Sequence, residues 1–265
     1  MASSPASPFF TDVHGSTYRL VEPGRFLMGD VNGNPTEQPT CTVEISQPFF
    51  LGERNVTQAF WLDIMGENPS KFQEGWSAGL RPVENINMND VQRFIERLNQ
   101  RDAEVMYLGL LGRWRLPSES EWEYASRADT QGRWSFGDKD IELDEYGWHA
   151  GNSGGTTREV GLKKANPWGF FDMNGLVQEW CADHWVKNYE GGRQQRPLLN
   201  DLARKHVVRG GAWFTESDAT RCGARSFADR EKRSDGLGLR LVWAPLDSQP
   251  VIQIQGASPS SKEQS

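Results

Sequence analysis

The chain has 265 residues, of which 37% are hydrophobic, and 27 glycines bring the apolar share to about the level usual for globular proteins. A formal net charge of −7 and a sequence pI near 5.3 argue against a protein that binds nucleic acid, because such sites need clustered Lys and Arg. No run of about 18 apolar residues is present, so we expect no membrane span.

Composition also defines the expected domain boundaries. Ser, Pro, Gln, Gly and Ala dominate residues 1–15 and 246–265, and such segments bury too little apolar surface to order themselves, so we expect two disordered tails. No linker or internal repeat divides residues 16–245, which favours one domain. The N-terminal residues lack the basic and apolar stretches of a secretory signal. We therefore expect a cytoplasmic protein, or an exported one whose signal has been removed.

The pattern of the N-terminal residues predicts short strands. Tyr18–Val21 and Arg25–Met28 are separated by Glu22–Gly24, whose Pro and Gly favour a tight turn, so we expect a hairpin. Cys41–Ile45 alternates apolar and polar residues, as in a strand with one buried face. Pro48–Gly52 follows as a strand that is buried on both faces.

Three helices are predicted next. Thr57 caps the first, which ends at Gly66. The second begins near Asn89 and continues to about residue 100, with apolar residues at the spacing of an amphipathic helix. Ser118 and Glu121 form a capping box at the start of a third, short helix through about residue 124. From about residue 129, frequent Gly, Trp, Asn and Asp indicate long loops and short strands.

Four motifs in this frame resemble a known family. They are Arg115–Tyr124 (RLPSESEWEY), Gly175–Trp180 (GLVQEW), Arg209–Trp213 (RGGAW) and Gly238–Val242 (GLRLV). Together they resemble the formylglycine-generating enzyme, or sulfatase-modifying factor, family over residues 16–243. This resemblance implies an α+β fold, a variant of the C-type lectin fold, with small twisted antiparallel sheets, two main helices and many loops.

The same resemblance implies an altered chemistry. In active members, two cysteines in the loop after the RGG motif bind copper and activate oxygen, and the matching positions here are Thr215 and Thr220. We therefore predict no catalytic residue. One hypothesis is a non-catalytic module that binds a protein, peptide or glycan, as do the variable proteins of diversity-generating retroelements. The alternative is an oxygen-dependent oxidoreductase of this family that uses residues other than a cysteine pair. Both hypotheses stay open at this point.

The predicted ligand-binding groove lies on the C-terminal loops, between residues 213–220 and 227–235. Aromatic rings there offer large contact areas with few rotors, and charged side chains offer strong hydrogen bonds. Their mixed signs suit a protein or peptide better than a nucleic acid. The predicted contact residues are Trp148, Trp185, Trp213, Phe214, Thr215, Glu216, Asp218, Thr220, Arg225, Phe227, Arg230 and Arg233.

Calcium is the one cofactor that the resemblance implies. Asn152 and Glu179 match positions of the two calcium sites in relatives, but Leu176 replaces an asparagine ligand. Ca²⁺ prefers six to eight oxygen ligands, so this loss weakens the site. Without calcium, we expect Glu179 to be a buried carboxylate that pairs with Arg115 or Arg240.

The cysteines and histidines add no further site. The odd number of cysteines leaves at least one thiol free, and a bridge between Cys181 and Cys222 stays open beside the alternative of buried thiols. The four histidines share no metal-ligand spacing.

Overall fold

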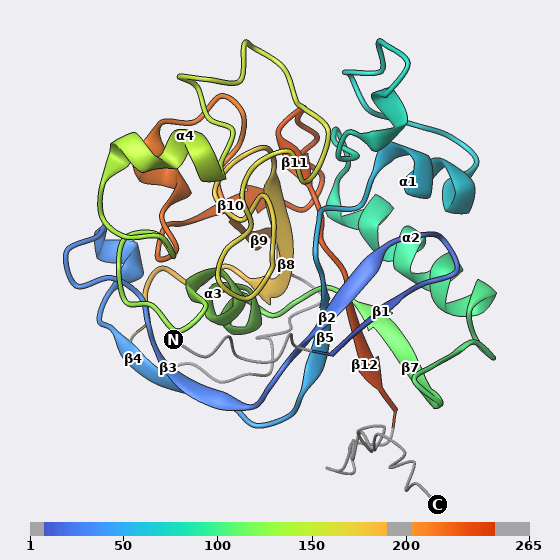
Figure 1. The fold of residues 1–265 in the computed structure, drawn as a ribbon, viewed down its shortest axis with the longest axis horizontal. Coiled ribbons are helices and arrows are strands. Elements are labelled where there is room, and N and C mark those ends of the chain that lie inside the picture. The colour runs from blue at the N-terminus through green and yellow to red at the C-terminus, as the bar shows by residue number, and fades with distance from the viewer. Residues whose placement is uncertain (1–7, 190–202, 247–265) are drawn as a thin grey trace, which may run out of the picture.

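A computed structural model of the chain describes residues 8–189 and 203–246, in which short strands and helices alternate with long loops (Figure 1). Its sheets have the strand orders β1-β2-β5-β12-β7-β6, β10-β9-β8-β11 and β3-β4. The strand pairs are antiparallel except that of β11 with β8. The expected α+β fold with small antiparallel sheets is confirmed.

The bounds of these elements are as follows. The first sheet contains β1 (Phe9–Thr11), β2 (Thr17–Val21), β5 (Phe49–Gly52), β12 (Val242–Pro245), β7 (Leu110–Arg115) and β6 (Met106–Tyr107). The second contains β10 (Arg225–Asp229), β9 (Lys205–Arg209), β8 (Gln178–His184) and β11 (Leu237–Gly238), and the third contains β3 (Gly24–Met28) and β4 (Cys41–Ile45). The helices are α1 (Gln58–Met65), α2 (Met88–Arg101), α3 (Glu119–Arg127) and α4 (Leu143–Tyr146), with short 3₁₀ turns η1 (Pro35–Glu37), η2 (Ala78–Leu80), η3 (Asp140–Glu142) and η4 (Ser217–Thr220).

The N-terminal hairpin forms one strand earlier than predicted. β1 pairs with β2 through a turn in which the Gly15 N–H donates to the Asp12 carbonyl. β2 then pairs with β5, while β3 pairs with β4 in another sheet, so the predicted β2–β3 hairpin is wrong. The folded part therefore begins before residue 16, because Phe10 on β1 is buried and its ring stacks 4.4 Å from the Tyr107 ring.

The three predicted helices are present, and their caps explain their limits. The Thr57 side chain accepts from the Phe60 N–H at the start of α1. α2 begins at Met88, because Asn87 and Asp90 form a capping box. α3 has the predicted box at Ser118 and continues to Arg127. No helix in the described ranges is long and apolar enough to cross a membrane.

Buried aromatic rings join the ends of the chain. Phe10 and Tyr107 belong to the two edge strands of the first sheet, and Trp243 belongs to β12 at its centre. The Trp243 ring lies 5.4 Å from the Phe10 ring and 5.7 Å from the Tyr107 ring. Such pairs stabilise a core beyond the area that they bury. The C-terminal strand thus closes the core that the N-terminal strands begin.

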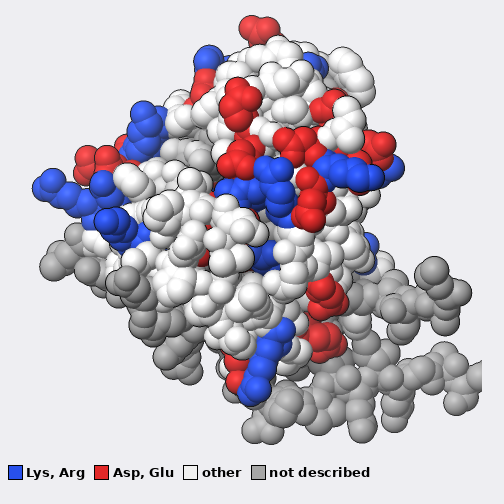
Figure 2. Space-filling model, turned by 90° about the vertical axis from the view of Figure 1, so that its left-hand side faces the viewer, with Lys and Arg blue, Asp and Glu red and all other residues white. Residues whose placement is uncertain are grey.

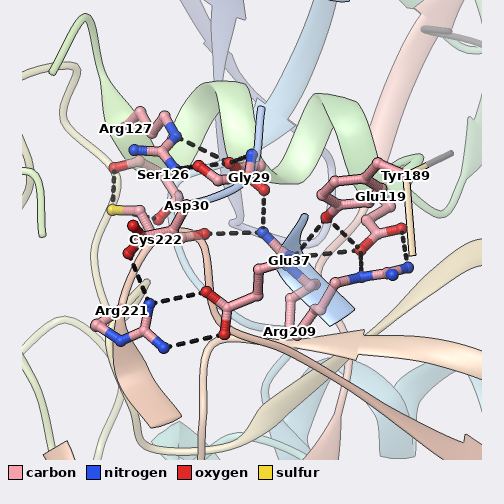
Figure 3. A network of polar contacts seen from close by, with 12 residues as sticks. Gly29, Asp30, Glu37, Glu119, Ser126, Arg127, Tyr189, Arg209, Arg221 and Cys222 are labelled. Atoms are coloured by element: carbon pink, nitrogen blue, oxygen red, sulfur yellow. Dashed lines mark hydrogen bonds and ion pairs between the residues drawn. The ribbon is translucent and has the colours of Figure 1, made fainter. Parts of the chain in front are cut away.

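A buried polar network ties α3 to the C-terminal segments (Figure 3). Arg209, the last residue of β9, pairs with Glu119 at 3.2 Å and with Glu123 at 2.5 Å. Arg221 donates to both carboxylate oxygens of Glu37 at 2.9 and 3.0 Å. Both arginine side chains are buried. The loop over residues 210–220 is therefore anchored at both ends.

Candidate functional site

The loop after β9 contains the two positions that hold cysteines in active relatives. β9 ends at Arg209, and Gly211 turns the chain with a φ of +74°. A Cβ atom at Gly211 would lie 2.8 Å from Thr220 Cγ2 and 2.9 Å from Thr215 Oγ1. Both threonines therefore pack against this one glycine, and the structure brings the two positions together.

Both threonine hydroxyls are engaged inside this loop. Thr215 Oγ1 accepts from the Ala212 N–H and donates to the Ala212 carbonyl, each at 3.0 Å. Thr220 Oγ1 accepts from Trp134 Nε1 at 3.0 Å and donates to the Ser217 carbonyl at 2.7 Å. Thr220 is fully buried, so the prediction that it contacts a ligand is wrong.

Trp213 and Phe214 lie beside Phe72, which belongs to the segment between α1 and α2. The Trp213 ring meets the other two rings edge-on, with centroid distances of 5.5 Å to Phe72 and 5.0 Å to Phe214. Trp213 Nε1 donates to the Asp235 carbonyl at 2.9 Å. Phe214 keeps 44% of its surface exposed. We call Phe72, Trp213 and Phe214 the aromatic surface. No sequence motif indicated Phe72.

Trp148 belongs to a segment that contacts this loop. The Ala150 N–H donates to the Thr215 carbonyl at 3.0 Å, and the Leu176 N–H donates to the Trp148 carbonyl at 2.8 Å. Lys163 Nζ lies 3.9 Å from the centroid of the Trp148 ring. A cation of the chain itself therefore already contacts the face of this ring.

Trp185 and Phe227 form a separate cluster, with their ring centroids 5.1 Å apart. Phe227 is on β10, whereas Asp235, which holds Trp213, lies just before β11. β10 and β11 are at opposite edges of the second sheet. Trp185 and Phe227 therefore lie apart from Trp213, and of the predicted stretch 227–235 the Asp235 end, not the Phe227 end, contacts the 213–220 loop.

Arg225 stabilises the fold and does not face a ligand. Its side chain is fully buried, and Nε and Nη2 donate to the two carboxylate oxygens of Glu119 at 2.6 and 2.8 Å. The guanidinium lies 4.2 Å from the centroid of the Trp185 ring. The prediction that Arg225 contacts a ligand is wrong, because its carboxylate partner comes from a helix 106 positions away in the sequence.

The remaining charged residues of the prediction lie at or near the surface. Asp218 pairs with two arginines at 2.6 and 3.1 Å. Arg230 donates to a side chain of α2 at 2.8 Å, and Arg233 pairs with Asp90 at 2.5 Å. Glu216 is exposed at the start of η4. Of these residues, Glu216 is the most available to a ligand, because its carboxylate forms no ion pair with a described residue.

The two predicted calcium ligands have separate surroundings. Glu179 is fully buried, and Arg240 pairs with its carboxylate at 2.8 Å, so Arg240 is the arginine partner of Glu179 in this structure. Asn152 bonds within its own turn, to the Asp144 side chain and the Gly147 carbonyl, both at 3.0 Å. The described residues contain no group of three or more His, Cys, Asp or Glu that is placed to hold a metal ion.

All three cysteines are free, so Cys181 and Cys222 are not bridged. Burial raises the pKa of both the Cys181 thiol and the Cys222 thiol. Reactive cysteines need a thiolate and access to solvent, and these two buried thiols provide neither at neutral pH.

Glu84 lies buried behind the aromatic surface, and no sequence motif indicated it. Its Oε1 accepts from the N–H groups of Lys71 and Phe72 at 2.6 and 2.9 Å. Its Oε2 is buried and has no hydrogen-bond partner among the described residues. Burial raises the pKa of Glu84 to about 7, although the two N–H bonds act in the opposite direction. The segment that carries Phe72 is thus held by a carboxyl group that titrates near neutral pH.

Charge on the face beside α4 is mixed. Figure 2 shows Lys and Arg interleaved with Asp and Glu on this face. Arg133, for example, pairs with Asp140 at 2.8 Å and with Asp218 at 2.6 Å. The described residues of this face therefore present no extended field of one sign to a phosphate backbone.

Comparison with known proteins agrees with this fold. The model of the sulfatase-modifying factor enzyme 1-like domain matches residues 10–245. Variable protein 1 of Treponema denticola has a similar structure, with a TM-score of 0.79 and 28% identity over 91% of this chain and 100% of that chain.

Curated relatives cover the chain less completely. The chaperone protein LppX of Paenibacillus barcinonensis is 25% identical over 237 residues, which are 73% of this chain and 79% of that protein. The formylglycine-generating enzyme of Mus musculus is 26% identical over 206 residues, which are 69% of this chain but half of the mouse enzyme. By the extent of the family match, the chain belongs to the sulfatase-modifying factor enzyme 1-like family.

Proposed function

We propose that this protein is a non-catalytic binding module that holds a protein or peptide ligand on the aromatic surface. The observation that carries this proposal is the aromatic pair Trp213 and Phe214 within the loop over residues 210–220. Phe214 is 44% exposed, while the neighbouring Trp213 ring is held by the Asp235 carbonyl and the Phe72 ring. Rigid aromatic side chains of this kind serve as anchors in protein interfaces, because little conformational entropy is lost when they bind.

The side chains of Thr215 and Thr220 in this loop favour a binding function over the copper chemistry of active relatives. Soft thiolate ligands suit Cu(I), whereas Thr215 and Thr220 offer hydroxyls that bond to carbonyls of their own loop. The family resemblance also implies that the matching C-terminal residues form the ligand-contact face in variable proteins. The likeness to the Treponema variable protein supports the same role here.

The charges near the aromatic surface favour a peptide over a glycan. Lys71 and Asp235 form a partly exposed ion pair of 2.5 Å beside Phe72 and Trp213. Glu216 is exposed two residues after Phe214. A peptide offers backbone donors and acceptors, together with charged side chains, to groups of both signs.

Selection of peptides from a displayed random library on the wild-type protein, followed by calorimetry with one selected peptide, tests this proposal. We expect Phe214→Ala to weaken binding of that peptide about tenfold or more, because loss of a central anchor costs about 1 to 3 kcal/mol. The Tm should barely move, because Phe214 is half-exposed. Phe227→Ala is the matched control. Phe227 is 40% exposed on β10, at the edge of the second sheet opposite to β11, beside which Trp213 is held.

Equal affinities of the Phe214→Ala variant and the wild type would place the binding site elsewhere. A loss of affinity with Phe227→Ala alone would assign it to the β10 edge. If the protein selects members of a glycan array and no peptides, the proposed ligand class is wrong.

A further inference from the structure

A cavity of about 800 Å³ lies on a part of the molecule that the proposed function does not use. The turn between β1 and β2, helix α1 and residues 159–160 surround it. Its apolar wall includes Val56, Phe60, Leu80 and Val160, and no residue of the aromatic surface lines it. Cavities of this size with apolar walls and a few polar groups are typical of small-molecule sites.

Two opposite charges line this cavity without pairing with each other, and the one ion pair of Arg54 with a described residue, to Glu53, is long. Arg54 donates one hydrogen bond, to Glu53 at 3.4 Å, and Glu53 pairs more closely with Arg19 at 2.7 Å. Glu159 forms no hydrogen bond or ion pair through its side chain with any described residue. Arg54 and Glu159 do not pair with each other either. The cavity therefore presents a guanidinium and a carboxylate to whatever enters it.

The Arg54 side chain is held in place. Its guanidinium lies 4.6 Å from the centroid of the Phe171 ring. A Cβ atom at Gly161, whose φ is +75°, would lie 2.3 Å from Arg54 Nε. The Gly161 N–H donates to Asp172 Oδ2 at 2.7 Å, which fixes this close approach. Because Glu159 is two residues before Gly161, its backbone lies near the Arg54 guanidinium.

The other charged residues of the cavity wall form ion pairs with neighbouring side chains. Asp63 pairs with Arg101 at 2.8 Å and with His14 Nδ1 at 3.2 Å. His14 Nε2 contacts Asp102 at 3.4 Å, and the His14 ring stacks 4.7 Å from the Phe60 ring. These residues form the wall beside Phe60, which leaves Arg54 and Glu159 as the groups that can select a charged ligand.

We propose that this cavity binds a small zwitterion with an apolar side chain, that is, an α-amino acid of the phenylalanine type. Its carboxylate bonds to the Arg54 guanidinium, and its ammonium group bonds to the Glu159 carboxylate. Its side chain packs against Phe60 and Val160. A planar guanidinium binds a carboxylate through two parallel hydrogen bonds, which gives both strength and orientation.

Calorimetry at pH 7 with four matched probes tests this site. The probes are L-phenylalanine, 3-phenylpropionate, which lacks the ammonium group, phenethylamine, which lacks the carboxylate, and glycine, which lacks the side chain. We expect L-phenylalanine to bind tightest and each of the other three to bind about tenfold more weakly or worse, which corresponds to about 1.4 kcal/mol. Two of these probes lack a charged hydrogen-bonding group, and glycine lacks the apolar side chain.

Variants then assign each charge. Arg54→Gln should weaken L-phenylalanine about tenfold or more, and Glu159→Gln should remove its advantage over 3-phenylpropionate. Gly161→Ala should also weaken binding, because its methyl group would displace the arginine. Arg25→Gln, at an exposed arginine of β3, is the control and should bind normally. Absence of L-phenylalanine binding at millimolar concentration, or equal affinities of Arg54→Gln and the wild type, would overturn the proposal.

Discussion

The Arg240→Ala variant is expected to lose about 3 to 5 kcal/mol of unfolding free energy, because it leaves the carboxylate of Glu179 buried and unpaired. The two side chains are fully buried and pair at 2.8 Å. The same guanidinium donates to the carbonyls of Gly52 and Glu53 at 2.9 and 2.8 Å and to that of Phe171 at 2.8 Å. Arg240 thus joins β8, the end of β5 and the Phe171 segment.

Denaturant unfolding of Arg240→Ala, Glu179→Ala and the double variant measures this effect. We expect the double variant to be clearly less destabilised than the sum of the two single variants, because removal of both charges leaves neither one uncompensated. Arg25→Ala is the surface control, since its pair with Glu44 is exposed and such pairs contribute about 1 kcal/mol or less. A loss for Arg240→Ala no larger than that for Arg25→Ala would contradict the role assigned to the buried pair.

Glu84 should make the stability of the protein fall as the pH rises through neutrality. Burial raises its pKa from an ordinary value of 4.5 to about 7 in the folded state, so the folded protein holds this proton more tightly than the unfolded chain does. The resulting stabilisation is complete below pH 4.5 and is lost as the pH rises through about 7. Its size is about 3 kcal/mol, at 1.36 kcal/mol for each pKa unit.

The difference in unfolding free energy between the wild type and Glu84→Gln isolates this contribution, because other buried acids also titrate. The pKa of Asp172, for example, is raised to about 6, mainly by burial. We expect the wild type to lose stability relative to Glu84→Gln between pH 5 and pH 8. Glu74→Gln, at an exposed position of the same segment, serves as the control. A pH-independent difference between the wild type and Glu84→Gln would show that Glu84 titrates normally.

Local signals in the sequence predicted the local structure well. Thr57 and Ser118 cap the helices that they were expected to cap, because a capping bond joins residues only three positions apart. The strand over Cys41–Ile45 follows directly from its alternation of apolar and polar residues. The family motifs likewise located the loop of Thr215 and Thr220, where both residues pack against Gly211.

Long-range pairing could not be predicted in the same way. Arg225 looks like a surface residue in the sequence, and only the fold brings Glu119 to it. The sequence places Phe227 and Trp213 in one predicted groove, but Phe227 is on β10 and Trp213 is held beside β11, at opposite edges of the second sheet. Phe72 and Glu84 lie outside every recognised motif. Only the fold places the Phe72 ring beside Trp213 and the Glu84 carboxylate beside the Lys71 N–H.

The most direct test of binding without catalysis is an assay for formylglycine. The protein is incubated with a peptide that contains the C-x-P-x-R motif, with copper and oxygen, and the peptide mass is followed beside the mouse formylglycine-generating enzyme as a positive control. We expect no conversion above the level without enzyme, because Thr215 and Thr220 cannot replace two thiolates at a copper ion. Conversion above that level would contradict the proposed function.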